Sequence, residues 1–334
     1  MSWPENHWYG SRAADRAVAR LLWPASLLFG AVAALRRAAY RCGILRAIRL
    51  PVPVVVVGNI CVGGTGKTPL TLALAAQLRA SGYRPGIVSR GYGGNARGVQ
   101  AVPATGDPRA YGDEPVLLAR RSGCPVWIGT DRAAAAGALL AAHPGCNLII
   151  CDDGLQHYAL ARDFEIAVVD GARGLGNGRL LPSGPLREPV SRLAAVSAIV
   201  VNGAGAAPAA GGAVYRMSLH GMQLHNLKDP ARRAPPAHFA GTRVHAVAAI
   251  GHPQRFFDHL RNLGINFSPH AFPDHYAFKA TDLAFGDDAP VIMTEKDAVK
   301  CEAFANDRHW VLQVEAILDG DLAGQVARQF GKPR

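Results

Sequence analysis

A short glycine-rich stretch, CVGGTGKTP at residues 61–69, has the chemistry of a phosphate-binding loop. Such a loop ends in Gly-Lys-Ser/Thr, here Gly66, Lys67 and Thr68, while Cys61 stands where the first glycine of the usual spacing belongs. Its backbone N–H groups would bind phosphate oxygens, Lys67 would reach the outer phosphates, and the Thr68 hydroxyl would suit Mg²⁺. The predicted nucleotide-binding residues are Cys61, Val62, Gly63, Gly64, Thr65, Gly66, Lys67 and Thr68. A plain glycine turn is the alternative interpretation.

A pair of adjacent carboxylates, Asp152 and Asp153, follows an apolar run in the stretch NLIICDDG. A carboxylate at the carboxyl end of a strand faces the ligand crevice of an open α/β sheet, where it can hold Mg²⁺ directly or through water. Alone, these letters would favour an Asp-Asp-Gly turn. Beside the glycine-rich loop they predict a metal site instead.

Short apolar runs alternate with helix-like segments from residue 52 onward, and these elements would position the polar groups. The predicted strands of the first part are 52–57, 86–89, 126–128, 148–151, 166–169 and 198–201, with helices at 69–79 and 132–140. Near-continuous Val/Ile runs are typical of strands covered on both faces. We therefore expect an α/β fold with a P-loop-containing, doubly wound, mainly parallel sheet. A second, smaller α/β domain is expected around strands at 244–250, 291–294 and 310–314.

The first 50 residues carry eight arginines and two acidic residues around an uncharged stretch, LLWPASLLFGAVAAL at 21–35. A helix of that length reaches roughly 22 Å, short of the roughly 30 Å hydrocarbon core of a bilayer. We expect a helix that lies in the membrane interface, with its arginines on anionic headgroups. A buried helix packed on the main domain is the alternative.

The predicted domain organisation has four parts. Residues 1–50 would form the membrane-interface segment and 51–203 the nucleotide-binding domain. The small residues GAGAAPAAGGA favour a flexible linker at 204–214, and 215–334 would form the smaller C-terminal α/β domain.

Composition limits the class of protein. With 334 residues, 49% hydrophobic and 18% charged, the chain is globular and not disordered. Its net charge of +11 suggests an anionic partner, but no basic run interleaved with aromatics indicates nucleic acid. The six cysteines include no CxxC pair, so we expect reduced, buried thiols of a cytosolic protein.

Seven motifs occur in order along most of the chain. They are VGGTGKTP (62–69), SRGYGG (89–94), GDEP (112–115), DDGLQH (152–157), LPSGPLRE (181–188), FPDHY (272–276) and TEKDAVK (294–300). Each is modest alone, but in this order they resemble the tetraacyldisaccharide 4′-kinase family, P-loop kinases of the lipid A pathway of Gram-negative bacteria. The resemblance implies an ATP- and Mg²⁺-dependent enzyme. Such an enzyme transfers the γ-phosphoryl group of ATP to the 4′-hydroxyl of a tetraacylated glucosamine disaccharide 1-phosphate.

The resemblance also implies a role for each matching residue. Asp113 would be the general base, His275 would pair with it, and Lys67 would complete the catalytic set. The implied metal ligands are Thr68 and Glu114 with Asp152 and Asp153 nearby, and the implied substrate or phosphate contacts are Arg187, Arg132, Gln156 and His157. Without the resemblance, Asp113 would as readily cap the helix that follows it, and His275 would more often be structural.

The same resemblance places the enzyme at the cytoplasmic face of the bacterial inner membrane. Its expected partners are the lipid A disaccharide 1-phosphate substrate and the anionic membrane surface, with no nucleic acid and no obligate protein partner. A P-loop switch ATPase that recruits partners at the membrane is the alternative function. The charges of TEKDAVK predict a solvated helix start, with nucleotide contact as the alternative.

Overall fold

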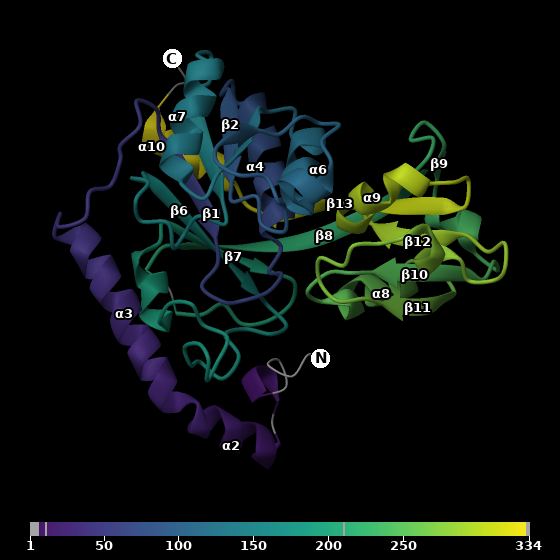
Figure 1. Cartoon of the computed structure of the whole chain (residues 1–334), viewed down its shortest axis with the longest axis horizontal. Coiled ribbons are helices and arrows are strands. Elements are labelled where there is room, and N and C mark those ends of the chain that lie inside the picture. The colour runs from purple at the N-terminus through teal and green to yellow at the C-terminus, as the bar shows by residue number, and fades with distance from the viewer. Residues whose placement is uncertain (1–6, 11, 210, 332–334) are drawn as a thin grey trace.

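The computed structural model describes residues 7–10, 12–209 and 211–331 (Figure 1). Its helices are α2 (Ala13–Leu21), α3 (Trp23–Arg41), α4 (Lys67–Ala80), α5 (Pro108–Tyr111), α6 (Asp113–Arg121), α7 (Arg132–Ala142), α8 (Pro253–Asn262), α9 (Glu295–Cys301) and α10 (Leu322–Phe330). Its strands are β1 (Val54–Gly58), β2 (Pro85–Ser89), β3 (Gln100–Ala101), β4 (Val126–Ile128), β5 (Leu148–Asp152), β6 (Phe164–Asp170), β7 (Ala198–Asn202), β8 (Ala213–Asn226), β9 (Arg233–Ala234), β10 (Val244–Ala248), β11 (Phe267–Ala271), β12 (Val291–Thr294) and β13 (His309–Asp319).

The strands form one continuous sheet in the order β11-β10-β12-β13-β8-β7-β6-β1-β5-β2-β4-β3, with β9 beside β8. In the first part, β1 lies between β5 and β6, and all its pairings are parallel. The antiparallel pairs are β3 with β4, β8 with β9, and β8 with β13. The expected α/β fold with a mainly parallel sheet is therefore confirmed.

The first part of the sheet is covered on both faces, as the apolar strand runs predict. Along β1, Val55 and Val57 pack into one core with residues of α4, α6 and α10. Val54 and Val56 pack into the opposite core with residues of α7. Because successive side chains of a strand point to opposite faces, a run of valines satisfies both cores at once. The carboxyl end of β1, where the glycine-rich loop begins, is thereby fixed in a rigid frame.

Two long strands connect the first part of the sheet to the group formed by β10, β11 and β12. Figure 1 shows β8 crossing the molecule between them, and β8 pairs with β7 in parallel and with β13 in antiparallel orientation. After β13 the chain returns to the first part of the sheet, where Leu322 and Val326 of α10 pack into the same core as α4. The four-part division at residues 50, 203 and 214 remains a prediction. The described residues between β7 and β8 contain no helix or strand.

Prediction of individual strands succeeded where burial is uniform. The six predicted strands of the first part each begin and end within two residues of an observed strand. The sequence did not predict β8, in which a few buried residues are separated by exposed ones, or the outer half of β13, which alternates between half-buried and exposed residues. Those strands pair with each other along most of their length, which a hydrophobic pattern does not report.

The apolar stretch near the N-terminus forms parts of two helices. α2 ends at Leu21 and α3 begins at Trp23, with Pro24 in the first turn of α3. Taken singly, none of the described helices is long and apolar enough to cross a membrane. Together α2 and α3 have the length and composition to do so, but they are bent by 52° relative to each other.

Candidate active site

The glycine-rich loop joins the carboxyl end of β1 to the first turn of α4, as its sequence predicts. Gly63 and Gly66 have φ angles of 105° and 95°, in a region that residues with a Cβ rarely adopt. At Gly66 a Cβ would also clash with the side-chain amide of Asn202, which donates a 2.9 Å hydrogen bond to the carbonyl of Thr65. Cys61 is buried and does not have a positive φ, so it fills the first position of the loop without that strain.

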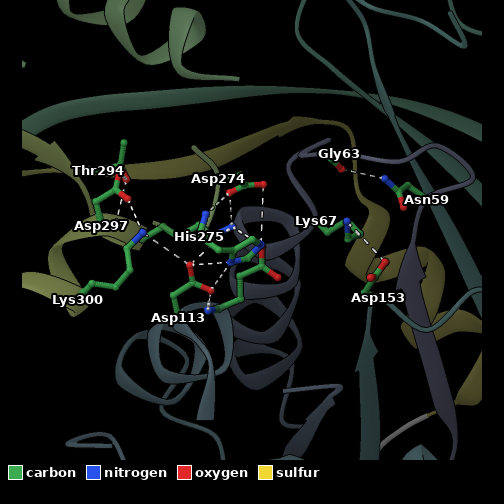
Figure 2. A network of polar contacts seen from close by, with 12 residues as sticks. Asn59, Gly63, Lys67, Asp113, Asp153, Asp274, His275, Thr294, Asp297 and Lys300 are labelled. Carbon is green, nitrogen blue, oxygen red and sulfur yellow. Dashed lines mark hydrogen bonds and ion pairs between the residues drawn. The ribbon is translucent and has the colours of Figure 1, made fainter. Parts of the chain in front are cut away.

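Lys67 begins α4 and contacts the second aspartate of the strand β5 motif. Its Nζ lies 3.6 Å from Oδ1 of Asp153, and Nη1 of Arg187 lies 3.4 Å from both oxygens of the same carboxylate (Figure 2 shows the Lys67 contact). Burial alone would raise the pKa of Asp153, but Lys67 and Arg187 lower it below its usual value. Asp153 has a φ of 50°, so its backbone is held in a rarely populated conformation, as is frequent at functional sites.

Asp152 differs from its neighbour because it is fully buried. Its Oδ1 accepts a 2.9 Å hydrogen bond from the Thr71 hydroxyl, whereas its Oδ2 has no hydrogen-bond partner. Burial, reinforced by the charge of Glu114, raises the pKa of Asp152 to about 7. A buried carboxylate oxygen without a partner is suited to a cation.

The oxygen atoms of Asp152, Glu114 and Thr68 are of the kind that binds Mg²⁺. Among the described residues, no three His, Cys, Asp or Glu side chains are arranged to hold a metal by themselves. Mg²⁺ usually takes only one or two carboxylates and completes its octahedron with water and substrate phosphates. Asp152, Glu114 and the Thr68 hydroxyl therefore form a suitable donor set for an ion that arrives with a nucleotide.

Asp113 and His275 meet across the molecule, although 162 residues separate them (Figure 2). Asp113 is the first residue of α6 and is 5% exposed, while Gly112 occupies the N-cap position. Nδ1 of His275 lies 3.1 Å from both oxygens of Asp113. Burial alone would raise the pKa of Asp113, but the hydrogen bond to His275 and the charge of Lys296 lower it. The same hydrogen bond raises the pKa of His275.

The prediction of a solvated helix start at TEKDAVK was wrong. Lys296 is nearly buried, and its Nζ lies 3.0 Å from Glu114, 3.3 Å from Asp274, 3.5 Å from His275 and 3.8 Å from Asp113. Burial alone would lower the pKa of Lys296, but the surrounding carboxylates raise it above its usual value. The Lys296 side chain faces the site because α9 packs against α6.

A second lysine of the same helix contributes to the cluster. Nζ of Lys300 lies 2.8 Å from Asp297 and 4.0 Å from Asp113. Asp297 is fully buried, and its other oxygen accepts a 2.7 Å hydrogen bond from the Thr294 hydroxyl (Figure 2). Asp113 therefore lies among one histidine and two lysines.

The remaining predicted residues lie around the loop that follows β5. Arg132 is buried at the start of α7, and its backbone N–H donates to Nε2 of His157 at 3.2 Å. Burial and the charge of Arg132 lower the pKa of His157 to about 4, so its ring is neutral at physiological pH. Gln156 donates 3.0 Å hydrogen bonds to the carbonyl of Asn59 and to Glu188. Gln156 and His157 are thus occupied by contacts that support the loops.

Comparison with known proteins decides the family. The sequence profile of the tetraacyldisaccharide-1-P 4′-kinase family matches residues 18–330. The chain belongs to this family. It is 54% identical to the tetraacyldisaccharide 4′-kinase of Azoarcus sp. (strain BH72), over 94% of this chain and 93% of the relative. It is 53% identical to that of Chromobacterium violaceum, over 95% of each.

A solved structure agrees with this membership. The "apo" form of LpxK from Aquifex aeolicus, crystallised in complex with ATP, superposes with a TM-score of 0.80 at 29% identity, covering 94% of this chain and 99% of that one. The predicted kinase activity, the use of ATP with Mg²⁺ and a role in lipid A synthesis are confirmed. The switch ATPase is not favoured. The family name implies a lipid A disaccharide phosphate as substrate and hence a membrane-associated role.

Several residues of this family member escaped sequence reasoning. Lys296 and Asp274 join the Asp113 cluster, and Arg255 of α8 reaches Asp170 at the end of β6 at 2.6 Å. Asn59 donates to the Gly63 carbonyl at 3.3 Å inside the loop (Figure 2). The available signal was position, because Asp170 and Asn59 follow apolar strands at the same sheet edge as Asp152. No comparable signal existed for Lys296.

Proposed function

We propose that this kinase uses Asp113 as the general base that activates the 4′-hydroxyl of its lipid acceptor. In the reaction, the hydroxyl oxygen forms a bond to the γ-phosphorus of ATP while the bond to the β-γ bridging oxygen breaks and ADP leaves. Asp113 accepts the hydroxyl proton, and the hydrogen bond with His275 orients the carboxylate and stabilises the charge change. The observation that carries the proposal is the 3.1 Å contact between the buried Asp113 and the partly buried His275.

The loop at residues 61–68 would hold the phosphates. Its backbone amides and the N-terminus of α4 favour anionic oxygens, and Lys67 supplies a charge at the first turn of that helix. A metal ion held by Thr68, Glu114 and Asp152 would neutralise charge on the phosphates. When ATP binds, Lys67 would leave Asp153 and contact the phosphates instead. Arg187 and Arg132 lie near Asp153, where they could contact the transferred phosphoryl group. Positioning and positive charge are the main requirements of phosphoryl transfer.

The proposal is tested with ATP labelled at the γ-phosphate and tetraacyldisaccharide 1-phosphate in detergent. Asp113→Asn and Lys67→Ala should each lower label transfer by about 100-fold or more. Matched controls are Asp288→Asn and Lys228→Ala, which change exposed residues paired only with exposed or half-exposed partners. Transfer that proceeds at the native rate in Asp113→Asn would reject Asp113 as the base.

We further propose that α2 and α3 lie on the cytoplasmic face of the inner membrane. One side of α3 docks on the protein, because the hydroxyl of Ser26 donates to the Leu180 carbonyl at 2.8 Å and accepts from the Ser183 N–H at 2.9 Å. Other apolar side chains of these helices are more than half exposed, including Leu21, Leu27, Leu28, Val32 and Leu35. An exposed apolar face flanked by arginines is typical of an interfacial helix.

The docked helix also connects to the active site. Nη1 of Arg36, in α3, donates a 3.1 Å hydrogen bond to the carbonyl of Gln156, which belongs to the loop after Asp153. A membrane-bound α3 would therefore hold that loop close to the lipid surface, from which the acceptor must come.

Sedimentation with vesicles containing phosphatidylglycerol tests this placement. The triple change Leu28→Ser, Val32→Ser and Leu35→Ser should lower the partition constant onto vesicles by about 1,000-fold or more, so that little protein sediments, because burying each apolar side chain contributes roughly 1.5–3 kcal/mol. The matched control is Val214→Ser, Met222→Ser and Ile317→Ser, three exposed apolar residues outside these helices. Equal sedimentation of both triple variants would contradict the proposal.

A further inference from the structure

The first turn of α9 is anchored on three sides. Thr294, at the N-cap, accepts a hydrogen bond from the Asp297 N–H, and Asp297 accepts a 3.0 Å hydrogen bond from the N–H of Ala249 just after β10. Glu295 pairs with Arg121 of α6 and accepts a 3.0 Å hydrogen bond from the N–H of Val314 in β13. These buried contacts fix the backbone that carries Lys296. The Lys296 side chain therefore extends from a fixed backbone position.

The side chain of Lys296 contacts groups on both sides of the active site. Asp113 and Glu114 come from α6 in the first part of the sheet, whereas Asp274 and His275 follow β11 in the second. The ammonium lies within 4 Å of all four, as given above. Lys300 also approaches Asp113, but its shorter contact is with Asp297. Among the described residues, Lys296 is the cation that contacts both Asp113 and His275.

We propose that Lys296 is a positioning residue for phosphoryl transfer, which holds the base Asp113 and its partner His275 in one arrangement with Glu114. This inference rests on the proposed function. Three carboxylates gathered at one site repel each other, and solvent screens that repulsion least at Asp113, the most buried of the three. The ammonium of Lys296 offsets it at the point where the carboxylates converge. The functional purpose of TEKDAVK is then to deliver this ammonium, with Thr294, Glu295 and Asp297 as its supports.

Two variants separate the charge from the length of the side chain. Lys296→Met keeps an unbranched apolar stem and removes the charge, whereas Lys296→Arg keeps the charge. Lys296→Met should lower kcat by about 100-fold and change KM for ATP and for the lipid by less than about 3-fold, because it misplaces the base without removing a substrate contact. Lys296→Arg should recover kcat to within about 10-fold of the native enzyme.

Folding and nucleotide binding are measured on the same samples. The Tm of Lys296→Met and its Kd for ATP should remain near native values, and Lys228→Met, an exposed lysine, serves as the matched control. A kcat within 3-fold of native in Lys296→Met overturns the inference. An equal loss in Lys296→Met and Lys296→Arg, or a loss that only follows the fraction of unfolded protein, overturns it as well.

A double mutant tests whether Lys296 acts through Asp113. In the Asp113→Asn background, with product counted over long incubations, adding Lys296→Met should cost less than about 3-fold, because residues that act as a unit are not additive. A further loss of about 100-fold in that background would show an independent role and overturn the inference. The two proposals fail differently. A native rate in Asp113→Asn rejects the proposed base, whereas a native rate in Lys296→Met with an inactive Asp113→Asn rejects only the positioning role.

Discussion

Nδ1 of His275 lies within hydrogen-bonding distance of both carboxylate oxygens of Asp113, although Asp113 begins α6, beside the first part of the sheet, and His275 follows β11 in the second part. His275 holds this position with a φ of 59°, which is rare for a residue with a side chain. The pair therefore exists only when both parts of the sheet are in place. The proton transfer proposed for the pair therefore depends on the packing of two elements that are far apart in the sequence.

Replacing His275 by Asn should lower kcat by about 10- to 100-fold, less than the loss expected for Asp113→Asn, because the base remains but loses its partner. Asn is a suitable replacement because it tolerates a positive φ better than most residues. The measurement is kcat at saturating ATP and lipid. The control is His220→Asn, an exposed histidine paired with Ser218. If His275→Asn turns over at the native rate, the pair has no catalytic purpose.

The stability contributed by this pair should depend on pH. The pKa of His275 is raised above its usual 6.5 in the folded protein, so its contribution is complete below about pH 6.5 and is lost as pH rises through the folded pKa. Asp113 has a lowered pKa and stays ionised over this range. The Tm difference between the native protein and His275→Asn should be larger at pH 6 than at pH 9. A difference that is constant with pH would contradict the raised pKa.

Gly66→Ala should weaken ATP binding. The φ of 95° is strained for alanine, and the added Cβ would clash with the Asn202 amide that holds the Thr65 carbonyl. We expect ATP affinity to fall by about 10-fold or more, because a strained conformation costs of order 1–3 kcal/mol. The control is Gly137→Ala in α7, where a Cβ meets no atom within 4 Å. Isothermal titration with ATP distinguishes the two, and native affinity in Gly66→Ala would mean that the loop relaxes around the change.

Alkylation should distinguish Cys61 from Cys42. Cys61 lies buried in the glycine-rich loop, and burial raises its pKa to about 11, so few molecules carry the reactive thiolate at pH 8. Cys42, at the end of α3, is exposed, which corrects the expectation that all six thiols are buried. Brief treatment with iodoacetamide should modify Cys42 and leave kinase activity unchanged. Peptide mass spectrometry that finds Cys61 modified at the same rate would contradict its burial.

Local sequence determined the glycine-rich loop and its flanking strand and helix. The spacing of Gly66, Lys67 and Thr68 between a valine run and a helix predicted the strand, loop and helix found in the structure, because φ and hydrogen-bonding requirements of such a loop are set by adjacent residues. The run that ends in Asp152 likewise predicted a carboxylate at the sheet edge. The order of seven motifs predicted the family, which the comparisons confirm.

Tertiary structure alone decided which distant groups meet. TEKDAVK reads as a polar helix start, and its charges became buried because α9 packs on α6 and finds there the carboxylates that compensate its lysines. The continuity of the sheet through β8 and β13 was also not predicted, since the pairing of these two strands joins residues that lie far apart in the sequence. Patterns along a chain report burial and local backbone preference, whereas the pairing of charges and strands depends on partners that can lie more than a hundred residues away.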